Sequence, residues 1–495
     1  MTSPIPAFDV SSDIIFVWLT QVQTGTSGSS GPAGVSIGRQ IPRLSVAPVW
    51  QTLEAILRPL AFYRRCFRGT RGVVRVRMSP TLPPQQVLIS DPAVIKDLMN
   101  EDGGPCVSAP GRLNGLLSQV VGQHSIILLA PTAHRQRRKL LTPPFHGERL
   151  KAYGHLIVSL AEQSMKDVLL GDVVDVRERM QAITMQVILT AVFGFDEGES
   201  FQQIARSLAE GGRIRTGPLG SLLLFFPFLR RDFGSWSPGG KIKATDATIR
   251  RLLLKQIATR RKALEQSSGQ DWKVDILSLL LACTDEQGQG LSDDELHDEL
   301  LTLLFAGHET TATALTWALY WIHRHPSVRQ RLLDELKAMR EPADPEAIAK
   351  LPYLSAVVNE VLRIHPVAML MFPRRIESAI SLGGFSFDPG DVVLSCIQAV
   401  HERSDLYADP DQFRPDRFLE RAYGSHEFIP FGGGSRRCIG AALAIYELKL
   451  ILAVVLQGAQ FRLTTISDRP NRPRRRGFTL GPSIPVKLEV VTAWR

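Results

Sequence analysis

Phe431-Gly-Gly-Gly-Ser-Arg-Arg-Cys-Ile-Gly440 is the stretch of this 495-residue sequence that decides its fold. Its three adjacent glycines permit a tight turn at positive φ and a close approach of the backbone to a bound group. An apolar helical run over 439–456 follows at once, so Cys438 is expected at a helix N-terminus. The dipole and free N–H groups of such a terminus stabilise a thiolate, which is a nucleophile or a metal ligand.

Three interpretations of this stretch are open. A single thiolate among backbone amides suits haem iron, which takes one strong axial ligand from the protein. Gly432 and Gly434 also imitate a dinucleotide-binding loop, but the strand before it and the acidic residue about 20 positions on are not in place. A buried structural cysteine in a glycine turn is the third interpretation.

A long central helix is predicted from 293 to about 323. Ser292 and Glu295 form a capping box at its start. Its middle carries Ala306-Gly-His-Glu-Thr-Thr-Ala312, where Gly and β-branched Thr are poor choices for a helix interior. Such a local weakness predicts a bend, either for function or because Gly307 lets a neighbour pack closely.

Three further patterns occur along the chain. Pro131 opens a helix that places His134 and Arg138 on one face. Glu360 and Arg363 lie three apart on another helix and by themselves indicate a surface ion pair. Phe413-Arg-Pro-Asp-Arg-Phe418 follows them.

Together these patterns resemble the cytochrome P-450 family, the haem-thiolate monooxygenases. The stretch at 431–440 matches the family's haem-binding loop F-G-x-G-x-R-x-C-x-G, and the other motifs follow the family's order. The resemblance covers about residues 46–495. It implies haem b as the cofactor, with Cys438 as the metal ligand. It also implies a cofactor site formed by the following residues: Phe431, Gly432, Arg436, Gly440, His134, Arg138, Arg374 and Ala306.

The resemblance assigns particular roles to some of these residues. His134, Arg138 and Arg436 bind the haem propionates, and Arg374 or Arg375 adds a further contact, with Arg374 preferred. Arginine suits this task because its fork of donors matches a carboxylate. Glu360, Arg363 and Arg417 form a buried triad that locks the fold. Arg417 comes from the segment 413–418, which resembles the family's P-E-R-F motif with Asp416 in place of its Glu.

The catalytic pair implied by the resemblance is Thr310 and Glu309. Thr310 hydrogen-bonds dioxygen, Glu309 relays protons from solvent, and the bend makes room for dioxygen and a water. A neighbouring carboxylate and hydroxyl form a sensible proton path. His308 is interpreted as structural, because no second histidine completes a zinc H-E-x-x-H motif.

Composition restricts the remaining classes. Apolar residues make up 44% and charged residues 22%, which is ordinary for a globular protein. The net charge of +9 is mild, and the basic run at 469–476 is interrupted by prolines and lacks aromatic residues, so no nucleic acid is expected as a partner. Five widely spaced cysteines predict no disulfide framework: Cys66, Cys106, Cys283, Cys396 and Cys438.

The predicted fold class is mainly α with small β-sheets. A flexible tail over 1–45, which includes the low-complexity run 24–31, precedes one large domain over 46–495, with the central helix over the haem. No transmembrane anchor is expected, since the nearest apolar run, 14–19, is too short, and the protein is predicted to be cytoplasmic and monomeric.

A lipophilic substrate is expected: a terpenoid, a steroid-like molecule, a polyketide or a fatty-acyl compound. The family places the pocket in segments 107–129, 209–228, 305–310, 367–372 and 478–482, which are apolar with few polar anchors. The apolar side chains in these segments are Leu116, Leu117, Val120, Leu222, Leu223, Leu224, Phe225, Phe226, Phe305, Met369, Leu370, Met371, Phe372 and Phe478.

Dioxygen is the expected co-substrate, and electrons are expected from a ferredoxin or flavodoxin with its reductase. A basic patch of Arg135, Arg137, Lys139 and Arg437 would dock the acidic electron donor. Two alternatives are kept. One is a peroxide-using or rearranging haem-thiolate enzyme, and the other is a haem-binding sensor or carrier.

Overall fold

The computed structural model describes residues 38–77, 86–194, 198–216, 231–234, 236–266, 275–284, 288–339, 344–464, 467–492 and 494. The chain separates into two units, Met1–Gly38 and Arg39–Arg495. In the second unit, Arg39 and Arg43 form isolated bridges with Phe385 and Arg75. The boundary at residue 45 stays a prediction, because residues 1–37 of the predicted tail lie outside the described residues.

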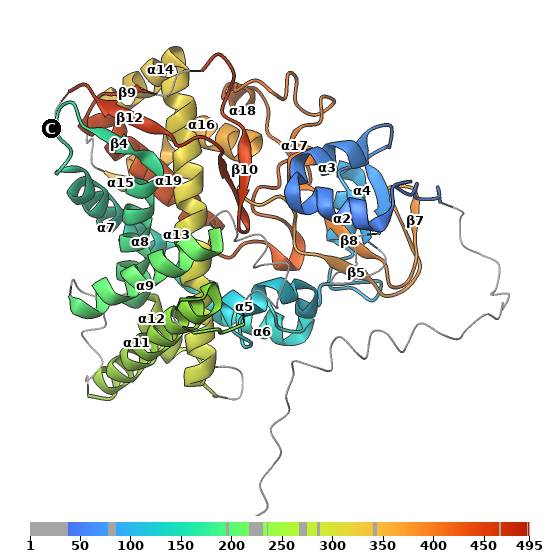
Figure 1. Cartoon of the computed structure of the whole chain (residues 1–495), viewed down its shortest axis with the longest axis horizontal. Coiled ribbons are helices and arrows are strands. Elements are labelled where there is room, and N and C mark those ends of the chain that lie inside the picture. The colour runs from blue at the N-terminus through green and yellow to red at the C-terminus, as the bar shows by residue number, and fades with distance from the viewer. Residues whose placement is uncertain are drawn as a thin grey trace, which may run out of the picture. The chain divides into compact units, whose positions relative to one another are not determined.

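Helices dominate the second unit (Figure 1). Many begin with a proline. Proline lacks an N–H, and this costs no hydrogen bond at a helix start because the N–H groups of the first turn have no acceptor within the helix. The α-helices are α2 Pro48–Leu57, α3 Pro59–Phe67, α4 Pro92–Asn100, α5 Ser118–Val121, α6 Pro131–Leu141, α7 Glu148–Met165, α8 Val176–Phe193, α9 Glu199–Thr216, α11 Pro238–Gln266, α12 Ile276–Ala282, α13 Asp293–Arg324, α14 Pro326–Lys337, α15 Pro345–Lys350, α16 Pro352–Ile364, α17 Ile397–His401, α18 Arg417–Glu420 and α19 Ala441–Gly458.

The sheets are small, and the predicted class, mainly α with small sheets, is confirmed. The largest has the order β1-β2-β8-β5-β3, in which β2 runs parallel to β8 and antiparallel to β1. The others have the orders β4-β12-β9, β10-β11 and β6-β7. The strands are β1 Val73–Val76, β2 Gln86–Ile89, β3 Val107–Ser108, β4 Val173–Asp175, β5 Arg374–Ile376, β6 Ile380–Leu382, β7 Phe385–Phe387, β8 Val392–Ser395, β9 Phe461–Leu463, β10 Pro473–Arg476, β11 Thr479–Pro482 and β12 Lys487–Val490.

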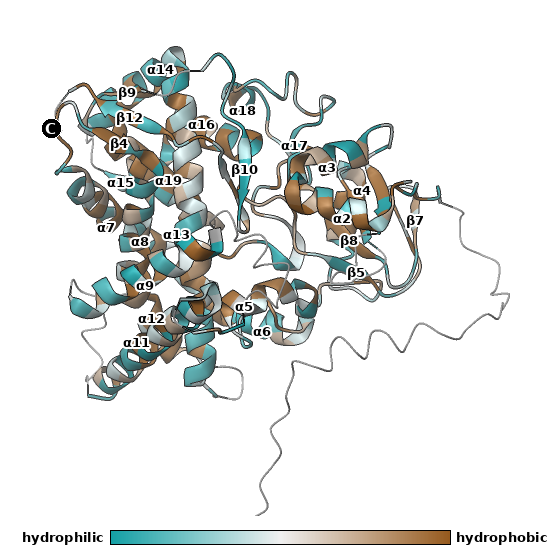
Figure 2. Cartoon of the chain, viewed as in Figure 1, coloured by the Kyte–Doolittle hydropathy of each residue, from teal (hydrophilic) through white to brown (hydrophobic). Residues whose placement is uncertain are grey.

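The strand β10 contains the second half of the basic run at 469–476. Its arginines lie in a hairpin with β11, where Arg476 pairs with Thr479. Because side chains alternate across a strand, the basic run is divided between two faces. Figure 2 shows β10 as a hydrophilic strand.

The central helix α13 organises the core. It starts with the predicted capping box of Ser292 and Glu295 and runs to Arg324. Every residue from Thr311 to Ile322 is buried, and α8, α16, α19 and β11 are among the elements that pack against α13 (Figure 1). The predicted long central helix is therefore confirmed.

The motifs at 360–363 and 413–418 meet in a buried ion triad. Arg363 donates to both Glu360 oxygens at 2.7 and 2.9 Å, and Arg417 Nε donates to Glu360 Oε1 at 3.1 Å. The three side chains are 0–2% exposed. The remaining guanidinium N–H groups donate to backbone carbonyls of the 401–412 segment, so the triad ties α16 to α17 and α18. The interpretation as a surface ion pair is wrong, and the predicted triad is confirmed.

The helix α19 is the most apolar long helix in the described part of the chain. It is long and apolar enough to cross a membrane by length and composition, but 67% of it is buried inside the protein. The prediction that 14–19 is the nearest such run is therefore wrong. Figure 2 shows the apolar character of α19.

Loss of the triad's carboxylate should destabilise the fold strongly. In Glu360→Gln, two buried guanidinium groups keep no counter-charge, so the free energy of unfolding in urea should fall by about 3–5 kcal/mol. The control is Asp416→Asn, which removes a pair with Arg331 whose side chains are 43% and 51% exposed. That exposed pair should contribute about 1 kcal/mol or less. Equal losses in the two variants would contradict the assigned role of the triad.

Glu447 on α19 should make stability depend on pH. Burial raises the pKa of Glu447 from its usual 4.5 to about 8, with no charged group nearby to oppose the shift. The folded state therefore holds a proton that the unfolded chain has released, and stability should fall as pH rises from about 4.5 to 8, by up to about 5 kcal/mol. Glu447→Gln should flatten this part of the pH profile of urea unfolding. Glu148→Gln, at a side chain that is 86% exposed, should leave it unchanged.

Candidate active site

The loop at 431–440 folds back on itself before α19. Gly432 and Gly434 have φ values of +68° and +64°, and the N–H of Cys438 donates to the Phe431 carbonyl at 3.0 Å. A Cβ on Gly434 would lie 2.2 Å from a carboxylate oxygen of Asp102. Position 434 therefore requires glycine, because its φ is positive and because a side chain would clash with Asp102. The predicted glycine turn is confirmed.

Cys438 lies three residues before the first residue of α19, Ala441. Burial raises the pKa of the Cys438 thiol, although the Gly440 N–H and the guanidinium groups of Arg138 and Arg437 act in the opposite direction. The N–H at the helix terminus thus favours the thiolate, as predicted, but burial has the larger effect on the pKa of the thiol. A metal cation on the sulfur would supply the missing charge, since coordination deprotonates a thiol outright.

Cys438 is solvent-accessible. Ala306 is exposed as well, although it lies in the middle of the central helix.

Basic groups converge beside the loop. The pKa of His134 is lowered to about 3, first by burial and then by Arg436, Arg138 and Arg374, whereas Asp102 opposes the shift. The pKa of Arg436 is lowered to about 10 by burial and by Arg374 and Arg138. Four basic groups thus share one region with one carboxylate, and this region favours further negative charge.

Arg436 is held by a cage of carbonyls. Its guanidinium donates to the carbonyls of Ala109 at 2.6 Å, Leu129 at 2.7 Å and Ile126 at 2.9 Å. These contacts tie the cysteine loop to the segment 109–129.

Arg374 faces the loop and Arg375 does not. Arg374 is buried on β5 and donates to the Gly433 carbonyl and to Asp102, both at 2.8 Å. Arg375 lies 3.7 Å from Glu377 and is half-buried. This alternation supports the choice of Arg374.

Asp102 is a residue that the sequence did not reveal. Its carboxylate accepts from Arg374, from the Ser435 N–H and from the Ser435 hydroxyl. It lies in a turn after α4 with no motif around it, and only its proximity to the loop in space shows its importance.

The middle of α13 is an uninterrupted part of the helix Asp293–Arg324, and the bend expected there stays a prediction. The hydroxyls of Thr310, Thr311 and Thr313 donate to the carbonyls four residues earlier, which satisfies the backbone locally. A Cβ on Gly307 would lie 2.6 Å from Ile188 Cδ1, so this glycine permits close packing of α8.

The side chains of this segment have separate partners. Glu309 pairs with Arg177 and accepts from Gln181, both on α8. His308 Nδ1 lies 2.6 Å from the Leu304 carbonyl. Burial lowers the pKa of this imidazole and so favours its neutral form, which agrees with a structural role. Within the described residues, no hydrogen bond or ion pair joins Ala306, Glu309 or Thr310 to the cysteine loop.

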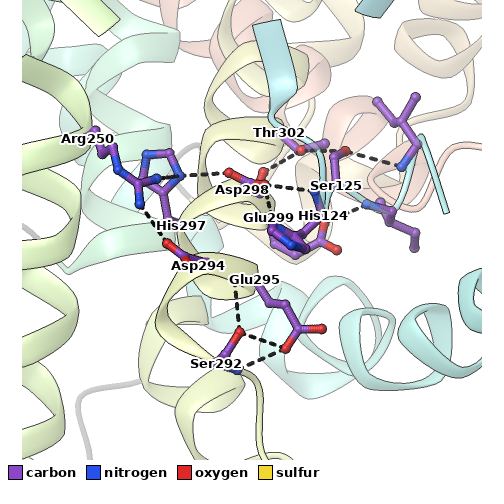
Figure 3. Close-up of polar contacts among 12 residues, drawn as sticks. His124, Ser125, Arg250, Ser292, Asp294, Glu295, His297, Asp298, Glu299 and Thr302 are labelled. Carbon is purple, nitrogen blue, oxygen red and sulfur yellow. Dashed lines mark hydrogen bonds and ion pairs between the residues drawn. The ribbon is translucent and has the colours of Figure 1, made fainter. Parts of the chain in front are cut away.

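A polar network at the start of α13 fixes the segment 124–127 (Figure 3). Asp298 accepts from the His124 N–H at 2.8 Å, Glu299 accepts from the Ile126 N–H at 3.2 Å, and the Thr302 hydroxyl donates to Ser125 at 2.8 Å. The carbonyl of the same residue, Ile126, accepts a hydrogen bond from Arg436.

The network also contains a residue assigned elsewhere by sequence. Arg137 is buried and pairs with Glu299 at 2.8 Å and with Glu295. The prediction that Arg137 belongs to an exposed docking patch is therefore wrong.

Comparisons with known proteins agree with this geometry. The profile of the family described as Cytochrome P450 matches residues 47–489. Cytochrome P450 135B1 of Mycobacterium tuberculosis is 31% identical over 470 residues, which are 94% of this chain and 93% of that protein. The chain belongs to the cytochrome P450 family. Cytochrome P450 137 of the same species is 30% identical over 421 residues, 85% of this chain and 83% of that protein.

Solved cytochrome P450 structures share the fold. The cyanobacterial CYP120A1 with bound retinoic acid matches with a TM-score of 0.75 at 25% identity, over 92% of this chain and 99% of that one. The haem domain of cytochrome P450DA matches with a TM-score of 0.76 at 21% identity, over 93% and 99% of the two chains. Cytochromes P450 are haem-thiolate monooxygenases that contain haem b, consume O₂ and take electrons from redox proteins, and this chain is an enzyme of that class.

The residues present fit haem b. The group carries two propionate carboxylates, and the region of His134, Arg138, Arg374 and Arg436 has an excess of positive charge to receive them. The accessible sulfur of Cys438 is the type of ligand that haem iron takes.

Proposed function

We propose that this monooxygenase hydroxylates or otherwise oxidises a lipophilic small molecule of the terpenoid, steroid-like, polyketide or fatty-acyl class. The observation that carries the monooxygenase assignment is the convergence of His134, Arg138, Arg374 and Arg436 beside the Cys438 loop. In this proposal Cys438 is the metal ligand, and the following residues hold the cofactor: Phe431, Gly432, Arg436, Gly440, His134, Arg138, Arg374 and Ala306.

Apolar side chains support the substrate class. The rings of Phe305 and Phe478 meet edge to face at 5.8 Å, and both residues are half-buried, as are Leu116 and Phe372. CYP120A1, which has this fold, was solved with retinoic acid, a lipophilic acid. Residues 217–228 of the predicted pocket segment 209–228 lie outside the described residues.

Two predicted wall residues belong to the core. Met369 and Met371 are 8% and 6% exposed and pack in the apolar clusters around the five-stranded sheet. They are better explained by packing than by contact with substrate.

Thr310 and Glu309 are proposed as the catalytic pair. The bound haem supplies the activation of O₂ and the oxidising power. The Thr310 hydroxyl, which donates to the Ala306 carbonyl, has lone pairs that can accept a hydrogen bond from a proton-carrying water. The Glu309 carboxylate, held by Arg177 and Gln181, is an acceptor that passes protons inward. A peroxide-using or rearranging enzyme, or a haem sensor or carrier, has little use for such a relay.

Electrons are proposed to come from a ferredoxin or flavodoxin with its reductase. Arg135 and Lys139 on α6 and Arg437 beside Cys438 are exposed, which supports a smaller docking patch than the one predicted. The assignment to the cytoplasm rests on the bacterial relatives, and the monomeric state stays a prediction.

Thiolate ligation should be visible in the reduced, carbon monoxide-treated protein. The wild type should show the strongly red-shifted Soret band of thiolate-ligated haem, and Cys438→His should lose it while retaining haem. Cys106→Ser is the matched control and should keep the band. A haem-loaded wild type without this band would contradict Cys438 as the ligand.

Charge reversal should slow electron delivery. In Arg135→Glu/Arg437→Glu, substrate-dependent NAD(P)H oxidation through ferredoxin and its reductase should fall about tenfold at low salt, and the difference should shrink as salt screens the contact. Arg251→Glu, at an exposed position on α11, is the control. Unchanged rates at low salt would refute this docking patch. Product formation from peroxide, with no NAD(P)H consumption, would favour the peroxide-using alternative.

A further inference from the structure

A cavity of about 880 Å³ is lined by no residue of the cysteine loop. It is formed by the end of α2, the start of α3, the end of α16, α17 and the β10–β11 hairpin. Leu480 is the one lining residue that also belongs to a predicted segment of the substrate pocket, and no predicted catalytic or cofactor-binding residue lines the cavity. Its size falls within the range of small-molecule sites. The lining residues used below are Leu57, Arg58, Leu60, Trp321, His365, Gln398, Arg472, Arg474 and Arg476.

The deep end of this cavity carries buried polar atoms without partners. Among the described residues, both ring nitrogens of His365, Trp321 Nε1 and Gln398 Oε1 find no hydrogen bond, although these side chains are 4–6% exposed. Such atoms are rare and destabilising in folded proteins. Each of them exposes less than 1 Å² of surface, so they lie beneath the cavity wall and do not face its interior.

Ring packing leaves only the edges of these side chains available. His365 stacks on Trp317 at 3.7 Å, and Trp321 stacks on Phe413 at 5.1 Å. The pKa of His365 is lowered to about 3 by burial and nearby arginines, so its ring is neutral, with one donor and one acceptor nitrogen. These stacked rings therefore form a closed wall beneath the cavity, and the arginines supply its polar groups.

The wall and mouth of the cavity are cationic. Seven arginines line it against two acids, Glu402 and Asp411. Arg363 is neutralised by Glu360 and Arg64 by Glu402, so the other five arginines supply the excess charge. Arg58, Arg472 and Arg474 are exposed, and no described carboxylate lies within ion-pair distance of them. Arg476 adds a buried Nε that lacks an acceptor.

We propose that this cavity binds a phosphate ester with an apolar organic part. Several separate guanidinium groups match the three oxygens of one phosphate better than the two of a carboxylate. The volume exceeds that of the anion alone, and the apolar lining, including Leu57 and Leu60, suits an organic chain.

Two sources share this chemistry: a soluble phosphorylated metabolite and a phospholipid headgroup. The exposed apolar face of α2 continues from the cavity wall, since Leu57 is 71% exposed and Trp50 and Val49 are 66% and 61% exposed. This face would accept acyl chains if the source is a lipid.

Calorimetric titration of the haem-loaded enzyme with dihexanoyl phosphatidate tests the proposal. The wild type should bind it, dihexanoylglycerol should not bind, and Arg472→Gln/Arg474→Gln should lose about tenfold or more in affinity. Arg472→Lys/Arg474→Lys should retain more of the affinity, and Arg251→Gln on α11 should change nothing. Thermal unfolding of each variant establishes that it is folded.

Two further arms identify the source. Binding of glycerol 3-phosphate would support a soluble metabolite, whereas co-sedimentation with phosphatidate vesicles, but not with phosphatidylcholine vesicles, would support a lipid. The proposal is overturned if the wild type binds none of these probes. It is equally overturned if binding survives unchanged in Arg472→Gln/Arg474→Gln, because the probe would then occupy another site such as the haem pocket.

Discussion

The guanidinium group of Arg436 is the junction on which the active site depends. It comes from the cysteine loop and donates to three carbonyls of the segment 109–129, so two stretches more than 300 residues apart are fixed against each other. That segment is in turn bound to the start of α13 through Asp298 and Glu299. The position of the cysteine relative to the central helix is thus set by polar contacts, whereas apolar packing sets the helix bundle around them. A buried polar group that loses its hydrogen-bond partner destabilises the folded state, so these contacts favour this one arrangement over others.

The elements that could be predicted from the sequence are those with a local signal. The central helix has a capping box and a long periodic pattern. The turn before Cys438 has three adjacent glycines, and two of them adopt positive φ values that other residues rarely adopt. The triad of Glu360, Arg363 and Arg417 could be expected only through the resemblance to a family, because an isolated Glu–Arg pair on a helix is usually exposed. Its burial is a property of the assembled fold.

The errors have a common physical origin. Arg137 and Asp102 became important through partners far away in the sequence, and no local pattern distinguishes them from surface charges. The weak helix formers in the middle of α13 are accommodated locally, because the threonine hydroxyls donate to carbonyls of the preceding turn. At Cys438 the N–H of Gly440 lowers the pKa of the thiol and burial raises it, and burial has the larger effect.

The backbone of Ile126 has a consequence for protein engineering. Its N–H donates to Glu299 on α13 and its carbonyl accepts from Arg436 in the cysteine loop, so one residue is bound by two distant partners. A loop graft that replaces 124–129 with the corresponding segment of a relative, for example to change substrate preference, would therefore disturb the cofactor side as well. Such a chimaera should be built as a set, with the matching residues of α6 and α13 transferred together with the loop.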